Sequence, residues 1–256
     1  MIDDRAVIAP GAVLGKDVTV GPFAIIGDDV EVGDGCHVGP HTILEGPTTL
    51  GRNNRIHAFA AIGTEPQDKK YAGEPTRLEI GDDNTIREYV SINRGTSQDQ
   101  GVTTIGDNNW IMAYVHIAHD CIVGSNTIMA NGATLAGHVE VGDYAILGGF
   151  TKAHQFCRIG AHSFCAMDSG LSRDVPVYVT AAGHLAKPSG INSEGLKRRG
   201  FTADQIRNIR QAYKIIYRSD LKLADAIAAL EEREPEQPEL APLTEFLRTT
   251  SRSIIR

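Results

Sequence analysis

The stretch IGDNNWIMAYVHIAHDCIVGSNTIMANGATLAGHVEVGDYAILGG, residues 105–149, carries an apolar or small residue at every sixth position, from Ile105 to Leu147. The same spacing begins at Ile2 and continues, with one shift of phase, as far as Leu171. An α-helix cannot use this period, because six residues turn through about 600° at 3.6 residues per turn. Six is a multiple of the two-residue period of a strand, so each hexad can be a short strand followed by a turn.

Hexapeptide repeats of this kind predict a parallel β-helix, a solenoid of triangular coils stacked into a prism. Since three hexads complete one coil, residues eighteen positions apart should stack about 4.8 Å above one another, the inter-strand spacing of a sheet. We expect residues 1–190 to form this solenoid as one domain, because neighbouring coils bury the core between them.

Two polar segments interrupt the repeat, at residues 64–79 (TEPQDKKYAGEPTRLE) and 94–104 (RGTSQDQGVTT). Both are rich in Gly, Pro or Gln, so we expect them to be loops ejected from the prism. Insertions in a solenoid usually collect on one face, which is often the binding face.

The hexads stop after about Val177, and we expect residues 191–256 to form a C-terminal α-helical domain. Thr202 to Gln205 reads as a capping box ahead of a helix that runs to Arg218. Further helices are expected at residues 221–232 and 243–248, with prolines between them. These helices would cap the end of the solenoid, which otherwise exposes unpaired strand edges.

Composition narrows the class of protein. The net charge of −7 argues against general nucleic-acid binding. No apolar run of eighteen residues is present, so no membrane span is expected, and the N-terminus enters the repeat without a signal-peptide pattern. A cytoplasmic location is therefore expected. The four cysteines occupy hexad positions and are interpreted as small buried residues in a reducing compartment.

Five of the nine histidines lie between positions 116 and 162, and the eighteen-residue register predicts that several of them share one edge of the prism. His119 should lie below Gly137, and Gly137 below Gln155. Asp120 should lie below His138, and the column that begins at Ala118 ends at His154. Such a cluster offers a base near neutral pH. Gly137 would let a substrate approach its backbone N–H, which could stabilise the oxyanion of an acyl-transfer intermediate.

No Ser or Cys nucleophile with an evident base stands out, which favours direct attack by an acceptor hydroxyl over a covalent acyl-enzyme. A competing interpretation of the same histidines is a metal site. Trimers that resemble gamma-class carbonic anhydrases hold zinc between subunits, and His116, His119 and His138 could serve in that way.

Six runs give the chain a specific resemblance: KYAGEPTR (70–77), HIAHDCIVG (116–124), ATLAGHVEVGDYAILGG (133–149), HQFCRIGAH (154–162), DVPVYV (174–179) and EGLKRRGF (194–201). Together they resemble the UDP-N-acetylglucosamine O-acyltransferase family, over essentially the whole chain. The resemblance implies left-handed coiling. It also implies transfer of a (3R)-3-hydroxyacyl chain from acyl carrier protein to the glucosamine 3-position of UDP-N-acetylglucosamine, the first step of lipid A synthesis, without a metal or other cofactor.

The resemblance also implies roles for individual residues. It makes His119 the general base, with Asp120 beside it and the Gly137 amide as the oxyanion donor. The residues that it places around the UDP-sugar and pantetheine are Asp68, Lys70, His116, His138, His154, Gln155, Asn192, Glu194, Arg198 and Arg199. Met167 corresponds to the residue that limits acyl-chain length, and a Met there implies a chain of about ten carbons.

Two expectations concern partners. Arg207, Arg210, Lys214 and Arg218 recur at helical spacing and would form a basic stripe for the acidic acyl carrier protein. A homotrimer is implied by the resemblance, and a deep acyl cleft on a prism edge needs a second wall, which a neighbouring subunit can supply.

Asn93 and Lys69 depart from the familiar members of the family, which carry His and an apolar residue at these positions. These departures leave open a 3-amino analogue of the UDP-sugar as the acceptor. The related N-acyltransferase of the same pathway is the runner-up, but it carries an extra N-terminal domain for which a repeat starting at Ile2 leaves no room.

Overall fold

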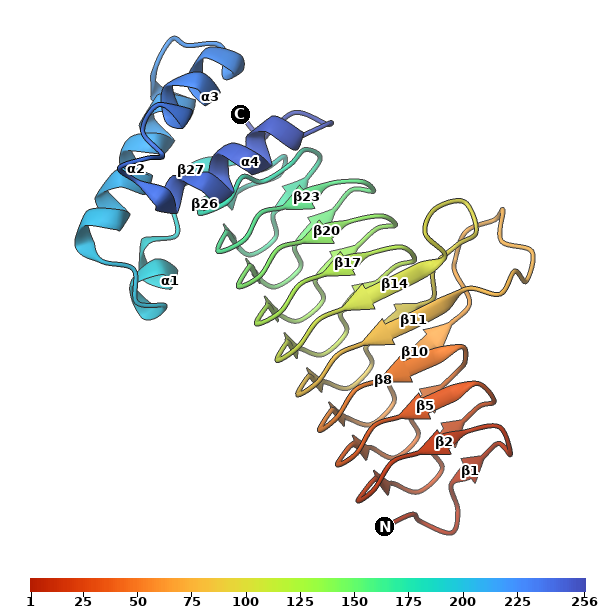
Figure 1. The fold of residues 1–256 in the computed structure, drawn as a ribbon. Coiled ribbons are helices and arrows are strands. Elements are labelled where there is room, and N and C mark those ends of the chain that lie inside the picture. The colour runs from red at the N-terminus through yellow and green to blue at the C-terminus, as the bar shows by residue number, and fades with distance from the viewer.

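A computed structural model describes all 256 residues, which wind into a left-handed parallel β-helix followed by helices (Figure 1). Each coil contributes one short strand to each of three sheets, and the sheets form the three sides of a prism. The fold class expected from the hexad repeat is therefore confirmed.

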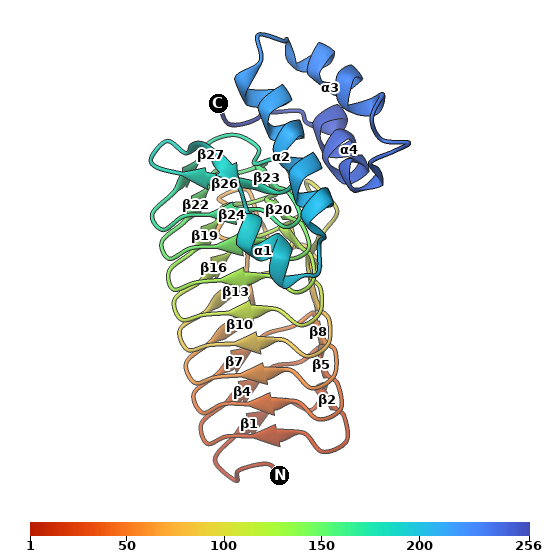
Figure 2. The ribbon, with the colours of Figure 1, turned by 90° about the vertical axis from the view of Figure 1, so that its left-hand side faces the viewer.

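The strands are short because a turn follows within each hexad. The nine-stranded sheet, labelled along its length in Figure 2, consists of β1 (Val7–Ile8), β4 (Ile25–Ile26), β7 (Ile43–Leu44), β10 (Ala61–Thr64), β13 (Ser91–Asn93), β16 (His116–Ile117), β19 (Thr134–Leu135), β22 (Lys152–Ala153) and β25 (Gly170–Leu171). The eight-stranded sheet consists of β2 (Val13–Leu14), β5 (Val30–Val32), β8 (Thr48–Leu50), β11 (Arg77–Ile80), β14 (Val102–Ile105), β17 (Ile122–Val123), β20 (Glu140–Val141) and β23 (Arg158–Ile159). The ten-stranded sheet consists of β3 (Thr19–Val20), β6 (His37–Val38), β9 (Arg55–Ile56), β12 (Thr85–Ile86), β15 (Trp110–Ile111), β18 (Ile128–Met129), β21 (Ile146–Leu147), β24 (Phe164–Cys165), β26 (Val179–Ala182) and β27 (Lys187–Ile191).

The register between coils is the one that the repeat predicts. His116 pairs with Thr134, and Thr134 pairs with Lys152, each step being eighteen residues. The stacking of the histidine columns therefore follows from the observed pairing.

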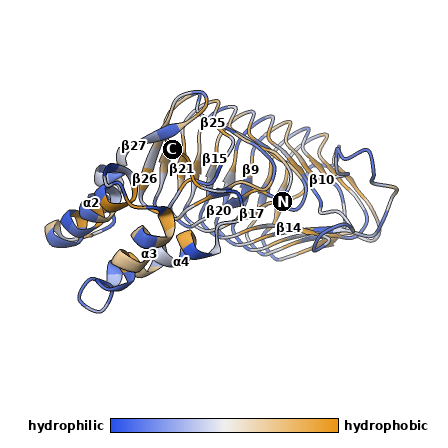
Figure 3. Ribbon diagram, turned by 90° about the horizontal axis from the view of Figure 1, so that it is seen from above, coloured by the Kyte–Doolittle hydropathy of each residue, from blue (hydrophilic) through white to orange (hydrophobic).

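The apolar residue of each hexad points into the prism, and polar and apolar residues alternate along the coils (Figure 3). Ile26, Ile56, Ile117 and Leu135 are fully buried, and burial of each such side chain contributes about 1.5–3 kcal/mol. Ile2 is the exception at 51% exposure, because a neighbouring coil covers it from one side only.

The prism has three corners, which we name after one residue each. The His119 corner joins the nine- and eight-stranded sheets, the Tyr144 corner joins the eight- and ten-stranded sheets, and the Met167 corner joins the ten- and nine-stranded sheets. Residues that turn the chain there have positive φ even when they are not glycine, as at Asp120 (58°), His138 (63°) and Tyr144 (61°).

The two ejected loops are shorter than expected. β11 already begins at Arg77 and β14 at Val102, because both strands continue the pairing of the eight-stranded sheet. The ejected segments are thus residues 65–76 and 94–101, and they leave the prism on the same side (Figure 1).

The helical tail contains α1 (Ser193–Arg198), α2 (Ala203–Arg218), α3 (Leu223–Glu231), η1 (Pro238–Leu240) and α4 (Ala241–Thr249). The capping box at Thr202 and Gln205 is present. The expected helix at residues 221–232 begins two residues later. The helix expected at residues 243–248 begins earlier, because Pro242 is tolerated in the first turn. The short helix α1, whose N-cap is Asn192, was not predicted from the sequence.

The tail covers the last coil of the prism, as expected. Tyr213 of α2 and Ile255 pack into the core of the β-helix, while Val177 and Tyr178 pack among the helices. None of the helices is both long and apolar enough to cross a membrane. All four cysteines are buried and unpaired, and burial raises the pKa of Cys121 and Cys165 to about 12, so their thiols stay protonated at neutral pH.

Candidate active site

The His119 corner brings together His119, Asp120, Gly137, His138 and Gln155 of the column that the eighteen-residue register predicted. The His119 ring lies directly against Gly137, so close that a Cβ on Gly137 would be 2.5 Å from His119 Cε1. The amide of Gly137 donates no hydrogen bond within the chain. A glycine here therefore leaves both space for the imidazole and an unused N–H donor beside it.

His119 is oriented by a buried carboxylate. Its Nδ1 lies 2.8 Å from Asp120 Oδ2. Because an ionised carboxylate only accepts hydrogen bonds, Nδ1 carries the proton and Nε2 is left as the free, basic nitrogen. This is the arrangement of a general base held by an orienting carboxylate.

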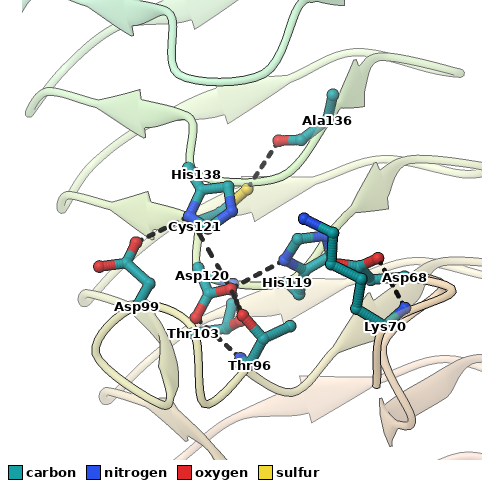
Figure 4. Close-up of polar contacts among 10 residues, drawn as sticks. All are labelled: Asp68, Lys70, Thr96, Asp99, Thr103, His119, Asp120, Cys121, Ala136 and His138. Atoms are coloured by element: carbon teal, nitrogen blue, oxygen red, sulfur yellow. Dashed lines mark hydrogen bonds and ion pairs between the residues drawn. The ribbon is translucent and has the colours of Figure 1, made fainter.

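Asp120 is itself fixed by the second ejected loop (Figure 4). Thr96 donates to it twice, from its backbone N–H at 2.8 Å and from its hydroxyl at 2.6 Å. Burial alone would raise the pKa of Asp120, but the hydrogen bonds from His119 and Thr96 outweigh it and hold the pKa below its usual value. Asp120 therefore stays ionised beside the imidazole.

His138 stands one coil higher with a second carboxylate. Its Nδ1 lies 2.7 Å from Oδ2 of Asp99, which belongs to the same loop as Thr96. The ring stacks on Phe156 with 4.3 Å between centroids and meets the His119 ring edge-on at 5.1 Å. Neither Thr96 nor Asp99 was predicted from the sequence. The only available signal was that their loop is ejected beside the predicted histidine column.

A polar hollow of about 850 Å³ opens in front of these groups. The predicted residues that line it are Asp68, Lys70, His119, His138 and Gln155, and they are joined by Gln67, Lys69, Gln98, Asp99 and Phe156. Both ejected loops therefore form its walls. Asn93, one of the two departures, anchors the first loop, because its side chain donates to Thr64 Oγ1 and to the Glu65 carbonyl.

Two predicted histidines do not line the hollow. His116 Nδ1 lies 2.8 Å from the Ser91 hydroxyl, and burial lowers the pKa of His116. His154 Nδ1 lies 3.1 Å from the Gln155 carbonyl. The groups close enough to share one cation are His119, Asp120 and His138, so the three-histidine zinc set that includes His116 is not the set that the structure gathers.

The predicted nucleotide-binding residues lie elsewhere, at the Tyr144 corner. Asn192, Glu194, Arg198 and Arg199 line a hollow of about 670 Å³ between α1 and the ten-stranded sheet. The Arg199 guanidinium lies over the Tyr144 ring, 4.9 Å from its centroid. A single chain therefore does not bring these residues to His119.

Met167 occupies the third corner and is 75% exposed. The basic stripe runs along the exposed side of α2, where Arg210, Lys214 and Arg218 line a shallow hollow. Arg207 instead pairs with Asp204 at 2.8 Å.

Comparison with known proteins first gives the class. A family model of the bacterial transferase hexapeptide repeat matches residues 11–46 and 103–137. A second model, described as domain 2 of UDP N-acetylglucosamine O-acyltransferase, matches residues 174–255. The fold and the matched repeats thus place the chain among hexapeptide-repeat transferases.

Full-length relatives then give the family. The acyl-[acyl-carrier-protein]--UDP-N-acetylglucosamine O-acyltransferases of Herminiimonas arsenicoxydans and Janthinobacterium sp. (strain Marseille) are 56% and 57% identical to the chain over 260 residues, covering 100% of it and 99% of each relative. The solved structure of LpxA from Acinetobacter baumannii is 44% identical, with a TM-score of 0.98 over 100% of this chain and 99% of that one. The chain belongs to the UDP-N-acetylglucosamine O-acyltransferase family, and it is an acyltransferase.

Proposed function

We propose that the protein transfers a (3R)-3-hydroxyacyl chain of about ten carbons from acyl carrier protein to the glucosamine 3-position of UDP-N-acetylglucosamine, as the first step of lipid A synthesis in the cytoplasm. The observation that carries this proposal is the group formed by the Asp120 carboxylate, the His119 imidazole and the unused Gly137 amide. A base and an oxyanion donor side by side are what acyl transfer to a hydroxyl requires.

In the proposed reaction His119 Nε2 removes the proton from the sugar hydroxyl as its oxygen attacks the thioester carbonyl. The Gly137 N–H stabilises the oxyanion of the tetrahedral intermediate. The intermediate collapses by breaking the carbon–sulfur bond, and the departing thiolate takes the proton back from His119. The products are the acylated UDP-sugar and the free thiol of the carrier protein, with no metal or cofactor in any step.

The proposal includes a homotrimer, because the candidate groups of one chain lie at three different corners. The base is at the His119 corner, the nucleotide-binding residues are at the Tyr144 corner, and the proposed chain-length residue is Met167. Neighbouring subunits that meet at their edges would gather these groups into one cleft. The polar hollow by itself is too hydrophilic to hold an acyl chain, since Phe156 is its only hydrophobic lining residue.

Acyl carrier protein is proposed to dock on the basic stripe of α2. The exposed side chains of Arg210, Lys214 and Arg218 form no ion pair within the chain, so they offer three free cations in an otherwise acidic protein. Such a patch would speed the encounter with a strongly acidic partner more than it would add affinity.

The test is to assay a His119→Ala variant with a 3-hydroxydecanoyl carrier-protein thioester and UDP-N-acetylglucosamine. We expect turnover to fall on the order of 100-fold or more while the assembly stays folded. Turnover like that of the wild type in a folded variant would overturn the assignment of the base.

Two further measurements separate the alternatives. Running the wild type with the 3-amino analogue in parallel decides which acceptor is preferred. Stoichiometric zinc together with CO₂ hydration would favour the carbonic-anhydrase alternative instead.

A further inference from the structure

The second ejected loop carries a carboxylate that the proposed chemistry does not use. Asp99 lies 39 positions before His138 in the chain, yet its Oδ2 is 2.7 Å from His138 Nδ1 (Figure 4). No other hydrogen bond of the Asp99 side chain is formed within the protein. The same histidine nitrogen is 3.9 Å from Asp120, so Asp99 is its nearer carboxylate by more than 1 Å.

We infer that Asp99 is a positioning residue, which holds the His138 ring so that its Nε2 faces the acceptor sugar. An ionised carboxylate only accepts hydrogen bonds, so Nδ1 of His138 must be the donor. Nε2 makes no hydrogen bond within the chain, and the ring lines the hollow in front of His119. Phe156 stacked on the ring prevents it from tilting, while Asp99 selects which nitrogen carries the proton. This inference rests on the proposed function, because it assigns Nε2 to the sugar of that reaction.

The pair contributes little to the stability of the fold. The Asp99 side chain is 39% exposed and the loop that carries it lies outside the prism, and exposed ion pairs are typically worth less than about 1 kcal/mol. Thr96 differs in this respect, because it is buried and bonds to the buried Asp120. Loss of Asp99 should therefore change how the sugar binds without changing how the protein unfolds.

The experiment compares Asp99→Ala and Asp99→Asn with the wild type. We expect the alanine variant to raise KM for the UDP-sugar about three- to tenfold, the effect of weakening one ordinary hydrogen bond, with kcat changed less than about twofold. The asparagine variant keeps an acceptor oxygen and should show less than half of that effect on a logarithmic scale. Gln100→Ala, the exposed neighbour on the same loop, is the matched control and should leave KM unchanged.

A second measurement, independent of turnover, reports which ring nitrogen of His138 carries the proton. In substrate-free protein labelled with 15N-histidine, the His138 signals, assigned with His138→Gln, should show a protonated Nδ1 in the wild type and a mixture of tautomers in Asp99→Ala. Unchanged KM and unchanged nitrogen signals in Asp99→Ala would overturn the inference. An equal rise of KM in Gln100→Ala would also overturn it, because the loop and not the carboxylate would then be responsible.

Failure of the proposed function remains distinguishable from failure of this inference. If folded His119→Ala turns over like the wild type, the proposed base is wrong, but the His138 signals in substrate-free protein still report whether Asp99 fixes the ring. If His119→Ala is inactive and Asp99→Ala changes neither readout, only the role of Asp99 is lost.

Discussion

Two corners of the prism place a histidine in the same left-handed turn position and stack it on an aromatic ring, but they surround it differently. His138 stacks on Phe156 and reaches Asp99, whereas His162 stacks on Tyr144 at 4.8 Å and its buried Nδ1 has no partner. Burial, with Arg199 nearby, lowers the pKa of His162 to about 4. The repeat builds the same backbone at both corners, so the ejected loop that supplies Thr96 and Asp99 is what distinguishes the corner proposed to be catalytic.

The largest effect should come from disturbing the His119 corner at Gly137. In Gly137→Ala the added methyl group would displace the His119 ring from its place 2.5 Å away and crowd the amide proposed to bind the oxyanion. We expect kcat to fall on the order of 100- to 1,000-fold, the loss seen when an oxyanion donor is removed. Steady-state kinetics on a variant of normal size in gel filtration gives the measurement.

The matched control for that change is Gly27→Ala, at the same corner among the N-terminal coils. Its Cβ would meet the Leu44 carbonyl at 3.4 Å, a contact that a small shift relieves. Activity should stay within about twofold of the wild type, since the coil lies away from His119. A comparable loss in both variants would mean that alanine damages the corner turn itself.

Met167, at the third corner, is proposed to select the length of the acyl chain. If this exposed side chain closes the acyl groove of a neighbouring subunit, Met167→Gly should admit longer chains. Four further methylenes at about 0.8 kcal/mol each correspond to a change in preference of up to about 200-fold. The measurement is kcat/KM with ten- and fourteen-carbon hydroxyacyl carrier proteins for both enzymes. A wild type that already prefers the longer chain contradicts the assignment.

The smallest effect should be on stability, at the Tyr144 corner. His162→Phe keeps an aromatic ring stacked on Tyr144 and removes the titrating imidazole. With a folded pKa of about 4, below the ordinary value of about 6.5, the unfolded chain binds more protons between these two values. Stability from this residue is therefore present above about pH 6.5 and is lost as pH falls toward 4.

Urea unfolding at pH 7.5 and pH 5 measures that difference. Between pH 7.5 and pH 5 the free energy of unfolding of the wild type should fall as His162 becomes protonated in the unfolded chain. Because phenylalanine does not titrate, we expect this fall to be smaller by about 1–2 kcal/mol in the variant, after allowing for partial exposure of the ring. An equal loss of unfolding free energy in both proteins would show that His162 is not the residue responsible for acid sensitivity at this corner.

Much of the candidate site could be predicted from the sequence, because residues eighteen positions apart in a β-helix stack in neighbouring coils. With a fixed step of eighteen residues, His119, Gly137 and Gln155 had to stack, and the structure places them so. The same arithmetic placed Asp120 below His138, and their side chains approach to 3.9 Å. The hexad period also determined the fold and the buried residues, since only a three-sided coil buries an apolar residue at every sixth position.

Tertiary structure decided what the period does not encode. The path of the ejected loop sets the contacts of Thr96 and Asp99 with residues 24 and 39 positions away, and a loop outside the repeat has no fixed step. The orientation of a ring is likewise decided by its neighbours. The His116 ring faces the Ser91 hydroxyl and therefore does not line the hollow. The sequence by itself determined the coil, the core and the column of candidate groups, including the neighbours His119 and Asp120. Folding in three dimensions determined that Asp99 reaches His138 and that Thr96 fixes Asp120, because those contacts join the repeat to a loop outside it.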